Sequence, residues 1–197
     1  MTYLLLISPT KENLIVAEEL TPKFLSKLSL SLDDFKSIRI NGTDLLKITY
    51  KNPLIPSSPT LPILPASYVT SDSGTGLVHT APGHGADDYN LLNKLDIFPF
   101  SPVDDEGKFT DTVRPISLVK LSVLREGNTA VIELLRESGA LMFEEVYEHK
   151  YPYDWRSKTP VIVRATEQWF ANVESIKEPA IKALQQTRMI PESGFPP

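Results

Sequence analysis

Short apolar runs dominate the first half of the chain, and their pattern predicts β-strands. Residues 3–8 and 14–17 are two such runs on either side of a polar turn, so we expect them to pair. Residues 37–50 contain an Asn-Gly dipeptide, which is typical of a turn between two extended pieces. Residues 66–70 and 76–80 are further apolar runs of strand length.

Apolar residues at helical spacing occur mainly in later segments. Residues 128–138 begin with an Asn cap and stop at Gly139, which is the clearest helix pattern in the chain. Residues 86–95 have two acidic residues in their first turn, where the helix dipole favours negative charge. Residues 175–186 predict a last helix, and a short early helix is expected to begin at Thr21-Pro22.

Prolines are concentrated in the middle of the chain, where nine of the 17 lie between Pro53 and Pro115. Proline limits helices and favours turns and short extended pieces. The predicted fold is therefore α+β and mostly β, with a closed, barrel-like sheet and peripheral helices over residues 1–145. Residues 146–197 are expected to form an extended β-ribbon and a C-terminal helix.

The composition excludes several classes of protein. Hydrophobic residues are 41% of the chain and charged residues 23%, as in a soluble globular protein. No apolar run approaches the roughly 18 residues that cross a membrane, so no membrane partner is expected. The absence of cysteine excludes disulfides, thiolate metal sites and a cysteine nucleophile. The net charge of −5 means that nucleic acid would have to bind a local basic patch.

Residues 74–89, which we call the signature segment, contain the densest set of chemically useful residues. The sequence GTGLVHTAPGHGADDY holds four glycines, two of the three histidines and the adjacent acids Asp87 and Asp88. A plain loop before a helix is one interpretation, and metal binding by His79, His84 and the two acids is another. The spacing matches no standard metal motif. The segment also lacks the G-x-S-x-G motif of a serine nucleophile and the lysine that follows the glycines of a P-loop.

The signature segment closely resembles the editing-domain signature of isoleucyl-tRNA synthetases. A second stretch, YPYDWRSKTPVIVRATEQWF at residues 151–170, resembles the ribbon that returns from the editing domain to the catalytic core of these enzymes. A third, PVDDEGKFT at residues 102–110, also matches the family. The three stretches occur in the family order, and the resemblance extends from about Tyr3 to about Gly194.

The resemblance implies a hydrolytic site that removes valine from the tRNA for isoleucine, a discrimination for which this family is the standard example. His79 and Asp88 would be the catalytic residues. Asp88 would bind the α-ammonium of the misattached amino acid, and His79 would line the side-chain pocket and place the ester. A positioned water would cleave the ester without a covalent nucleophile. The substrate-binding residues would be Gly74, Thr75, Gly76, His79, Thr80 and Asp88.

For His84 and Asp87 a role in ordering the loop and a direct functional role stay open. We also expect no zinc, because Tyr153, Asp154 and Ser157 occupy a turn where many relatives carry cysteines.

Basic and aromatic residues are interleaved after residue 148. A ribbon of this composition could contact the acceptor end of tRNA, which the resemblance implies is tRNA(Ile), through Lys150, Arg156, Lys158 and Arg164. The favoured interpretation is that the ribbon packs against the remainder of the synthetase, which is the second expected partner.

Some features of the family are not found in this sequence. A threonine-rich strand that precedes the signature segment in these enzymes is not found, and neither are the aminoacylation motifs. ATP and magnesium are therefore expected only for a full-length synthetase, and no cofactor for this chain. A non-catalytic module that binds tRNA or a partner is the alternative function. The expected location is the cytoplasm or the mitochondrial matrix, and residues 195–197 depart from the family pattern.

Overall fold

The computed structural model describes residues 1–191 and 194, and it divides the chain into two units, residues 1–165 and residues 166–197. The predicted functional boundary between residues 145 and 146 stays a prediction. The predicted departure from the family at residues 195–197 lies outside the described residues.

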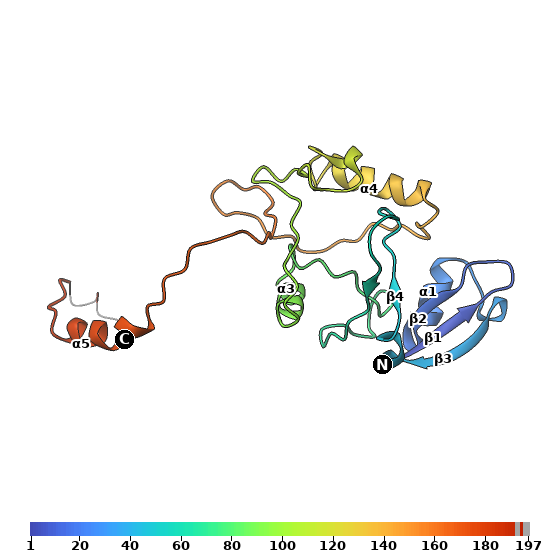
Figure 1. Cartoon of the computed structure of the whole chain (residues 1–197), viewed down its shortest axis with the longest axis horizontal. Helices are drawn as coiled ribbons and strands as arrows, with labels where there is room; N and C mark the ends of the chain where they lie inside the picture. The colour runs from blue at the N-terminus through green and yellow to red at the C-terminus, as the bar shows by residue number, and fades with distance from the viewer. Residues whose placement is uncertain (192–193, 195–197) are drawn as a thin grey trace. The chain divides into compact units, whose positions relative to one another are not determined.

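The first unit begins with a three-stranded antiparallel sheet (Figure 1). Strand β1 (Thr2–Ile7) lies in its centre, between β2 (Leu14–Ala17) and β3 (Lys36–Asn41). Leu4 is opposite Val16 on one side and Arg39 on the other. The two strands predicted at residues 3–8 and 14–17 are thus confirmed, and so is their pairing.

The hydrophobic core of the first unit lies against this sheet. A 3₁₀ turn η1 (Glu18–Leu20) leads directly into helix α1 (Thr21–Lys27), which buries Leu25. The central strand contributes Leu6, which is fully buried. A second 3₁₀ turn, η2 (Leu32–Asp34), precedes β3, and the short helix α2 (Gly42–Leu45) follows it. The buried core residues are Tyr3, Leu4, Leu6, Leu14, Val16, Ala17, Leu20, Leu25, Phe35 and Leu45.

The closed barrel expected from the sequence is wrong for the residues that the structure describes. The Asn-Gly dipeptide does not turn a hairpin, because helix α2 begins at Gly42. Strand β4 (Thr49–Tyr50) instead pairs with β5 (Leu61–Pro62) in a separate two-stranded sheet. A barrel needs every strand to pair on both sides. The proline-rich middle of the chain cannot supply a ladder of N–H donors, so it runs as single extended pieces.

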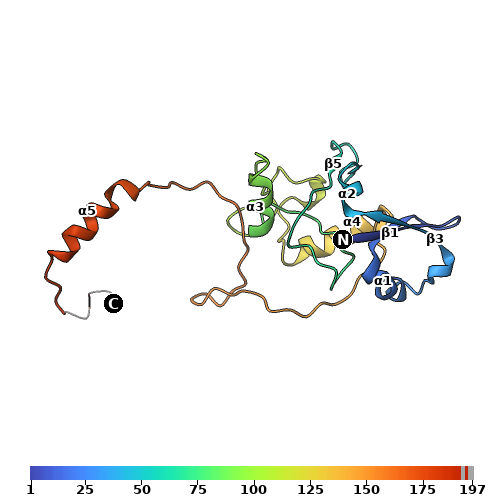
Figure 2. The ribbon, with the colours of Figure 1, turned by 90° about the horizontal axis from the view of Figure 1, so that it is seen from below.

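The predicted helices are present with small shifts of their ends. Helix α3 (Ala86–Asn93) follows the signature segment, and a 3₁₀ turn η3 (Ile116–Leu118) precedes helix α4 (Glu126–Glu137). Gly139, with φ of 73°, ends α4 as predicted. In the second unit, α5 (Glu174–Gln185) continues through Pro179 as one helix (Figure 2).

Residues 146–165, which we call the ribbon, are extended but form no strand. They turn back on themselves through one isolated bridge between Tyr153 and Pro160, and the Asp154 amide donates to Thr159 O over 2.9 Å. The expected β-ribbon is therefore only a short turn with two extended arms. Residues 66–70 and 76–80, also expected as strands, are irregular.

Candidate functional site

The start of the signature segment rests on the edge of the N-terminal sheet. The Ala17 amide donates to the Thr75 carbonyl over 2.8 Å, and the Tyr3 hydroxyl donates to the Gly76 carbonyl over 2.9 Å. Burial raises the pKa of Tyr3, so its hydroxyl keeps the proton that it donates. Two backbone carbonyls of the predicted substrate-binding loop are thus held by the sheet.

Gly74 and Gly76 both have the left-handed backbone that favours glycine, with φ of 69° and 74°. A Cβ atom at Gly76 would lie 2.5 Å from Ala17 Cβ, whereas one at Gly74 would meet nothing within 4 Å. Close backbone approach therefore occurs at Gly76, and its neighbour is strand β2. The predicted role of Gly74, Thr75 and Gly76 in binding substrate stays a prediction.

The Asp88 carboxylate is held at both of its oxygen atoms. The Tyr68 hydroxyl donates to Asp88 Oδ1 over 2.6 Å, and the Ala81 amide donates to Oδ2 over 2.8 Å. Burial raises the pKa of Tyr68, and the nearby Asp88 charge raises it further. Asp88 lies in the first turn of α3, so it ties this helix to the loop before it. Nothing in the sequence pattern singled out Tyr68, which comes from an apolar run 20 residues upstream.

The two histidines of the signature segment have different surroundings. His79 is exposed, and no hydrogen bond to it is present among the described residues. His84 is half-buried, and its Nδ1 lies 3.0 Å from the Val163 carbonyl, so this nitrogen carries the donated proton. Its Nε2 lies 3.4 Å from Ser101 Oγ. These contacts favour the interpretation that His84 orders the loop.

The ribbon is attached to the signature segment beside His84. The Ala165 amide donates to the Gly83 carbonyl over 2.8 Å, and a Cβ atom at Gly83 would lie 2.2 Å from the Phe100 carbonyl oxygen. The predicted tRNA-binding residue Arg164 donates to the Val103 carbonyl over 2.8 Å and pairs with Asp105. Its guanidinium therefore fastens the ribbon to the loop at residues 103–105.

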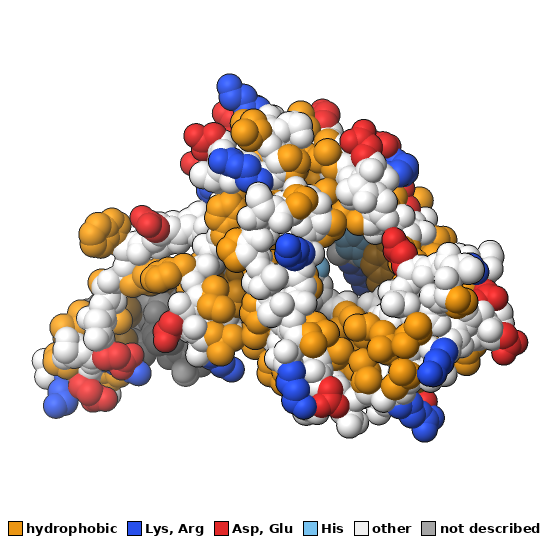
Figure 3. Space-filling view, turned by 45° about the vertical axis from the view of Figure 1, so that its right-hand side comes forward, with side chains coloured by type: hydrophobic (Ala, Val, Ile, Leu, Met, Phe, Trp, Pro, Cys, Tyr) orange, Lys and Arg blue, Asp and Glu red, His pale blue; other side chains and the backbone are white. Residues whose placement is uncertain are grey.

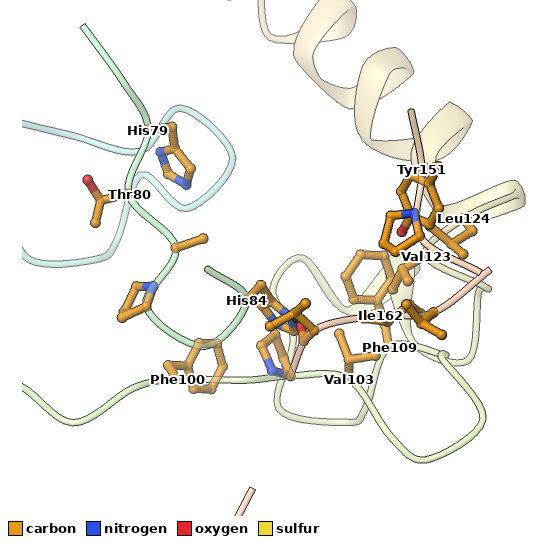
Figure 4. Close-up of a pocket in the computed structure, with 16 residues that line it drawn as sticks. His79, Thr80, His84, Phe100, Val103, Phe109, Val123, Leu124, Tyr151 and Ile162 are labelled. Atoms are coloured by element: carbon orange, nitrogen blue, oxygen red, sulfur yellow. Dashed lines mark hydrogen bonds between the residues drawn. The ribbon is translucent and has the colours of Figure 1, made fainter. Parts of the chain in front are cut away.

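A cavity of about 630 Å³ lies between the signature segment and the ribbon (Figure 4). His79 and Thr80 are at one end, and Phe109, Ile162 and Tyr151 are at the other. The cavity is lined by His79, Thr80, Ala81, Pro82, His84, Phe100, Pro102, Val103, Phe109, Val123, Leu124, Tyr151, Pro152, Val161, Ile162 and Val163.

The structure brings together some of the predicted site residues and leaves others apart. His79 and Thr80 share the cavity, and Asp88 is linked to its wall through the Ala81 amide. Gly74, Thr75 and Gly76 are not among the lining residues. The apolar lining was not foreseen, because it combines residues from several separated stretches of the chain.

A row of aromatic rings follows the first arm of the ribbon. Tyr147 and His149 stack with centroids 5.6 Å apart, followed by His149 and Tyr151 at 5.9 Å and Tyr151 and Tyr153 at 6.4 Å. Alternate residues of an extended chain point to one side, so spacing of two could have predicted this row. Arg156 lies over the Trp155 ring at 4.8 Å.

Three of the four predicted tRNA-binding residues form no ion pair among the described residues, namely Lys150, Arg156 and Lys158. The face drawn in Figure 3 mixes basic, acidic and apolar side chains rather than gathering the basic ones.

Across residues 1–191 and 194, no group of three His, Asp or Glu side chains is placed to hold a metal ion. His79, His84 and Asp88 do not form such a group among these residues, and the metal-binding interpretation stays untested. The helices of the described residues include none that is long and apolar enough to span a membrane.

Comparison with known proteins identifies the relatives of the chain, although no protein-family model matches it. The isoleucine–tRNA ligase of Cyanothece sp. (strain PCC 7425) is 48% identical over 181 residues, which are 92% of this chain and 18% of that ligase. The Acaryochloris marina ligase is 46% identical over 93% of the chain and 18% of its own length. The Thermosynechococcus vestitus ligase is 44% identical over 98% of the chain and 20% of its own length.

The chain spans about a fifth of the length of these curated relatives. Nearly all of it takes part in the similarity, including the three stretches that resemble the synthetase family. The chain is therefore a homologue of one segment of the isoleucine–tRNA ligases.

Proposed function

We propose that this chain is an editing domain that hydrolyses valine from tRNA(Ile). In the reaction a water oxygen attacks the ester carbonyl carbon, the bond from that carbon to the ribose oxygen breaks, and valine and the free tRNA hydroxyl are released. The similarity to isoleucine–tRNA ligases over 92% or more of the chain supports a substrate of this class.

The fixed carboxylate of Asp88 is the observation on which the proposal rests. A carboxylate held by two donors is preorganised to accept charge-assisted hydrogen bonds from an α-ammonium group. His79 and Thr80, on the cavity wall that Asp88 supports, would then face the ester and the aliphatic side chain. We assign the rejection of isoleucine to the His79 end of the cavity, because the cavity as a whole is too large to distinguish valine from isoleucine by size.

The proposal needs no cofactor in this chain, since a positioned water suffices for ester hydrolysis. ATP and magnesium would serve the aminoacylation site of a complete ligase. The partners would be the acceptor end of tRNA(Ile) and the remainder of that ligase, in the cytoplasm or the mitochondrial matrix.

Deacylation of Val-tRNA(Ile) and Ile-tRNA(Ile) by the whole chain tests the proposal. We expect faster hydrolysis of the valine ester, and a loss by a factor of about 10 to 100 in Asp88→Ala, which removes a charged hydrogen-bond partner. The matched control is Asp87→Ala, because Asp87 is exposed and its carboxylate makes no hydrogen bond among the described residues. A folded chain that hydrolyses neither ester would contradict the proposal.

The aromatic row of the ribbon favours a second candidate, a module that binds RNA without turnover. Aromatic rings bind unpaired bases by stacking, at about 1–3 kcal/mol per base. Binding of an unhydrolysed acceptor-stem RNA, lost when Tyr147 and Tyr153 are changed to alanine, would support this candidate if deacylation is absent. Both side chains are well exposed, at 76% and 61%.

A further inference from the structure

A line of polar contacts connects the segment before the signature to the first turn of α3. The Tyr68 hydroxyl reaches Asp88, and the Thr80 hydroxyl is a further polar neighbour of Tyr68. Tyr68 thereby ties the segment before the signature to the first turn of α3. We propose that Tyr68 is a positioning residue that fixes the Asp88 carboxylate to receive the α-ammonium of the substrate, an inference that rests on the proposed function.

The geometry at the carboxylate leaves room for a ligand. Each carboxylate oxygen has two acceptor positions, and the chain uses one on each oxygen. Donors at both oxygens stop the group from rotating about its bond to Cβ, so the two remaining acceptor positions keep a fixed direction. A substrate ammonium, which has up to three N–H donors, can use both without displacing a protein contact.

The two donors to Asp88 contribute in different ways. The Ala81 amide is part of the backbone and cannot be removed by a side-chain change. The Tyr68 hydroxyl is the side-chain donor to this carboxylate among the described residues. Because it is half-buried and its pKa is raised above the usual value, it stays protonated at neutral pH and donates.

Neighbouring residues provide controls of the same chemical type. Tyr89 on α3 is 41% exposed, and its hydroxyl makes no hydrogen bond among the described residues. Tyr68→Phe and Tyr89→Phe remove the same atom from two tyrosines in one neighbourhood. A loss that is confined to Tyr68→Phe therefore reports the contact with Asp88 and not the loss of a hydroxyl in general.

The test measures steady-state hydrolysis of Val-tRNA(Ile) by the whole chain and by both variants. We expect Tyr68→Phe to raise KM about tenfold with kcat within about twofold of the parent, since it weakens the hold on the ammonium. Tyr89→Phe should leave both constants unchanged. With a tRNA ester of the matching α-hydroxy acid, which lacks the ammonium, Tyr68→Phe should behave like the parent.

Each result decides between distinct conclusions. Equal KM values for the parent and Tyr68→Phe, or an equal loss with the α-hydroxy ester, would overturn the role of Tyr68 while the proposed function stands. A parent chain that hydrolyses neither ester would overturn the proposed function and this inference with it. An independent readout is ¹³C NMR of labelled tyrosine: Asp88→Asn should lower the pKa of Tyr68, and an unchanged titration would contradict the contact.

Discussion

The N-terminal sheet region, residues 2–45, and the signature segment are held in place by different forces. The sheet region buries ten apolar side chains in one cluster, and its strands pair residue by residue. The signature segment has only two buried residues, Gly76 and Gly83, and is fixed by hydrogen bonds and close backbone contacts. Burial of apolar side chains stabilises the sheet region. The signature segment is instead held in place by its hydrogen bonds and backbone contacts to that region.

The two regions meet at Ala17 and Tyr3, which lie in the sheet and donate to carbonyls of the signature segment. This arrangement suggests that changes in the sheet region affect overall stability, while changes in the signature segment affect local geometry. Four substitutions test that difference, each with a control variant.

The largest effect is expected in the core. Leu6→Ala should lower the free energy of unfolding by about 4 kcal/mol, because it leaves a cavity at a fully buried position of the central strand. Ile38→Ala on β3, where the side chain is 39% exposed, should cost far less. Urea denaturation followed by circular dichroism measures both, and equal losses would contradict this view of the sheet region.

A smaller loss is expected at the contact between the regions. Gly76→Ala should cost about 3 kcal/mol, from the left-handed backbone and from the collision with Ala17 Cβ together. Gly74→Ala has the same backbone strain without the collision, so about 1 kcal/mol is expected. The same denaturation measurement separates the two variants. If Gly74→Ala were the more damaging, the proposed packing of Gly76 on β2 would be incorrect.

The hydrogen bond from Tyr3 to the Gly76 carbonyl should contribute less. Tyr3→Phe is expected to cost about 1.5 kcal/mol, because a largely buried carbonyl loses its donor. Tyr50→Phe is the control, since its hydroxyl makes no hydrogen bond among the described residues. Faster amide exchange at residues 75–77 in Tyr3→Phe, with little change in the strands, would show that the effect is local.

The smallest effect concerns a surface carboxylate of the sheet region. The hydrogen bond from Lys11 first, and the Ser31 amide next, lower the pKa of Asp34. Its stabilising contribution is thus present above the ordinary pKa of aspartate and is lost as the pH falls through the lowered value. The difference in melting temperature between the parent and Asp34→Asn should shrink from pH 7 to pH 2. A melting-temperature difference that stays constant with pH would contradict the contribution assigned to Asp34. An equal pH response in Asp33→Asn would contradict it as well.

Sequence reasoning succeeded where one local signal determines the structure. Short apolar runs on either side of a polar turn located β1 and β2, and the Gly139 stop located the end of α4. Sequence reasoning failed where contacts between residues far apart in the chain determine the structure. The barrel would have needed strand pairings that the proline-rich middle of the chain cannot make. The Asn-Gly signal was overridden by helix α2, whose Leu45 is buried in the core.

The site was predictable only in part, for a related reason. The resemblance selected His79 and Asp88, and the structure links both to the wall of the cavity. The partner that holds Asp88, Tyr68, has no local pattern to mark it, since its role depends on a fold that brings residues 20 positions apart together. The apolar lining was hidden for the same reason.

The attachment of the ribbon has a consequence for how the cavity would respond to strain. One side of the cavity is formed by residues 151–163, which have no strand ladder of their own. Hydrogen bonds at His84, Gly83 and Arg164 attach that side to the rest of the cavity wall at three points. Pulling on the chain beyond Ala165 would therefore load these hydrogen bonds on the cavity wall before it reached the hydrophobic core.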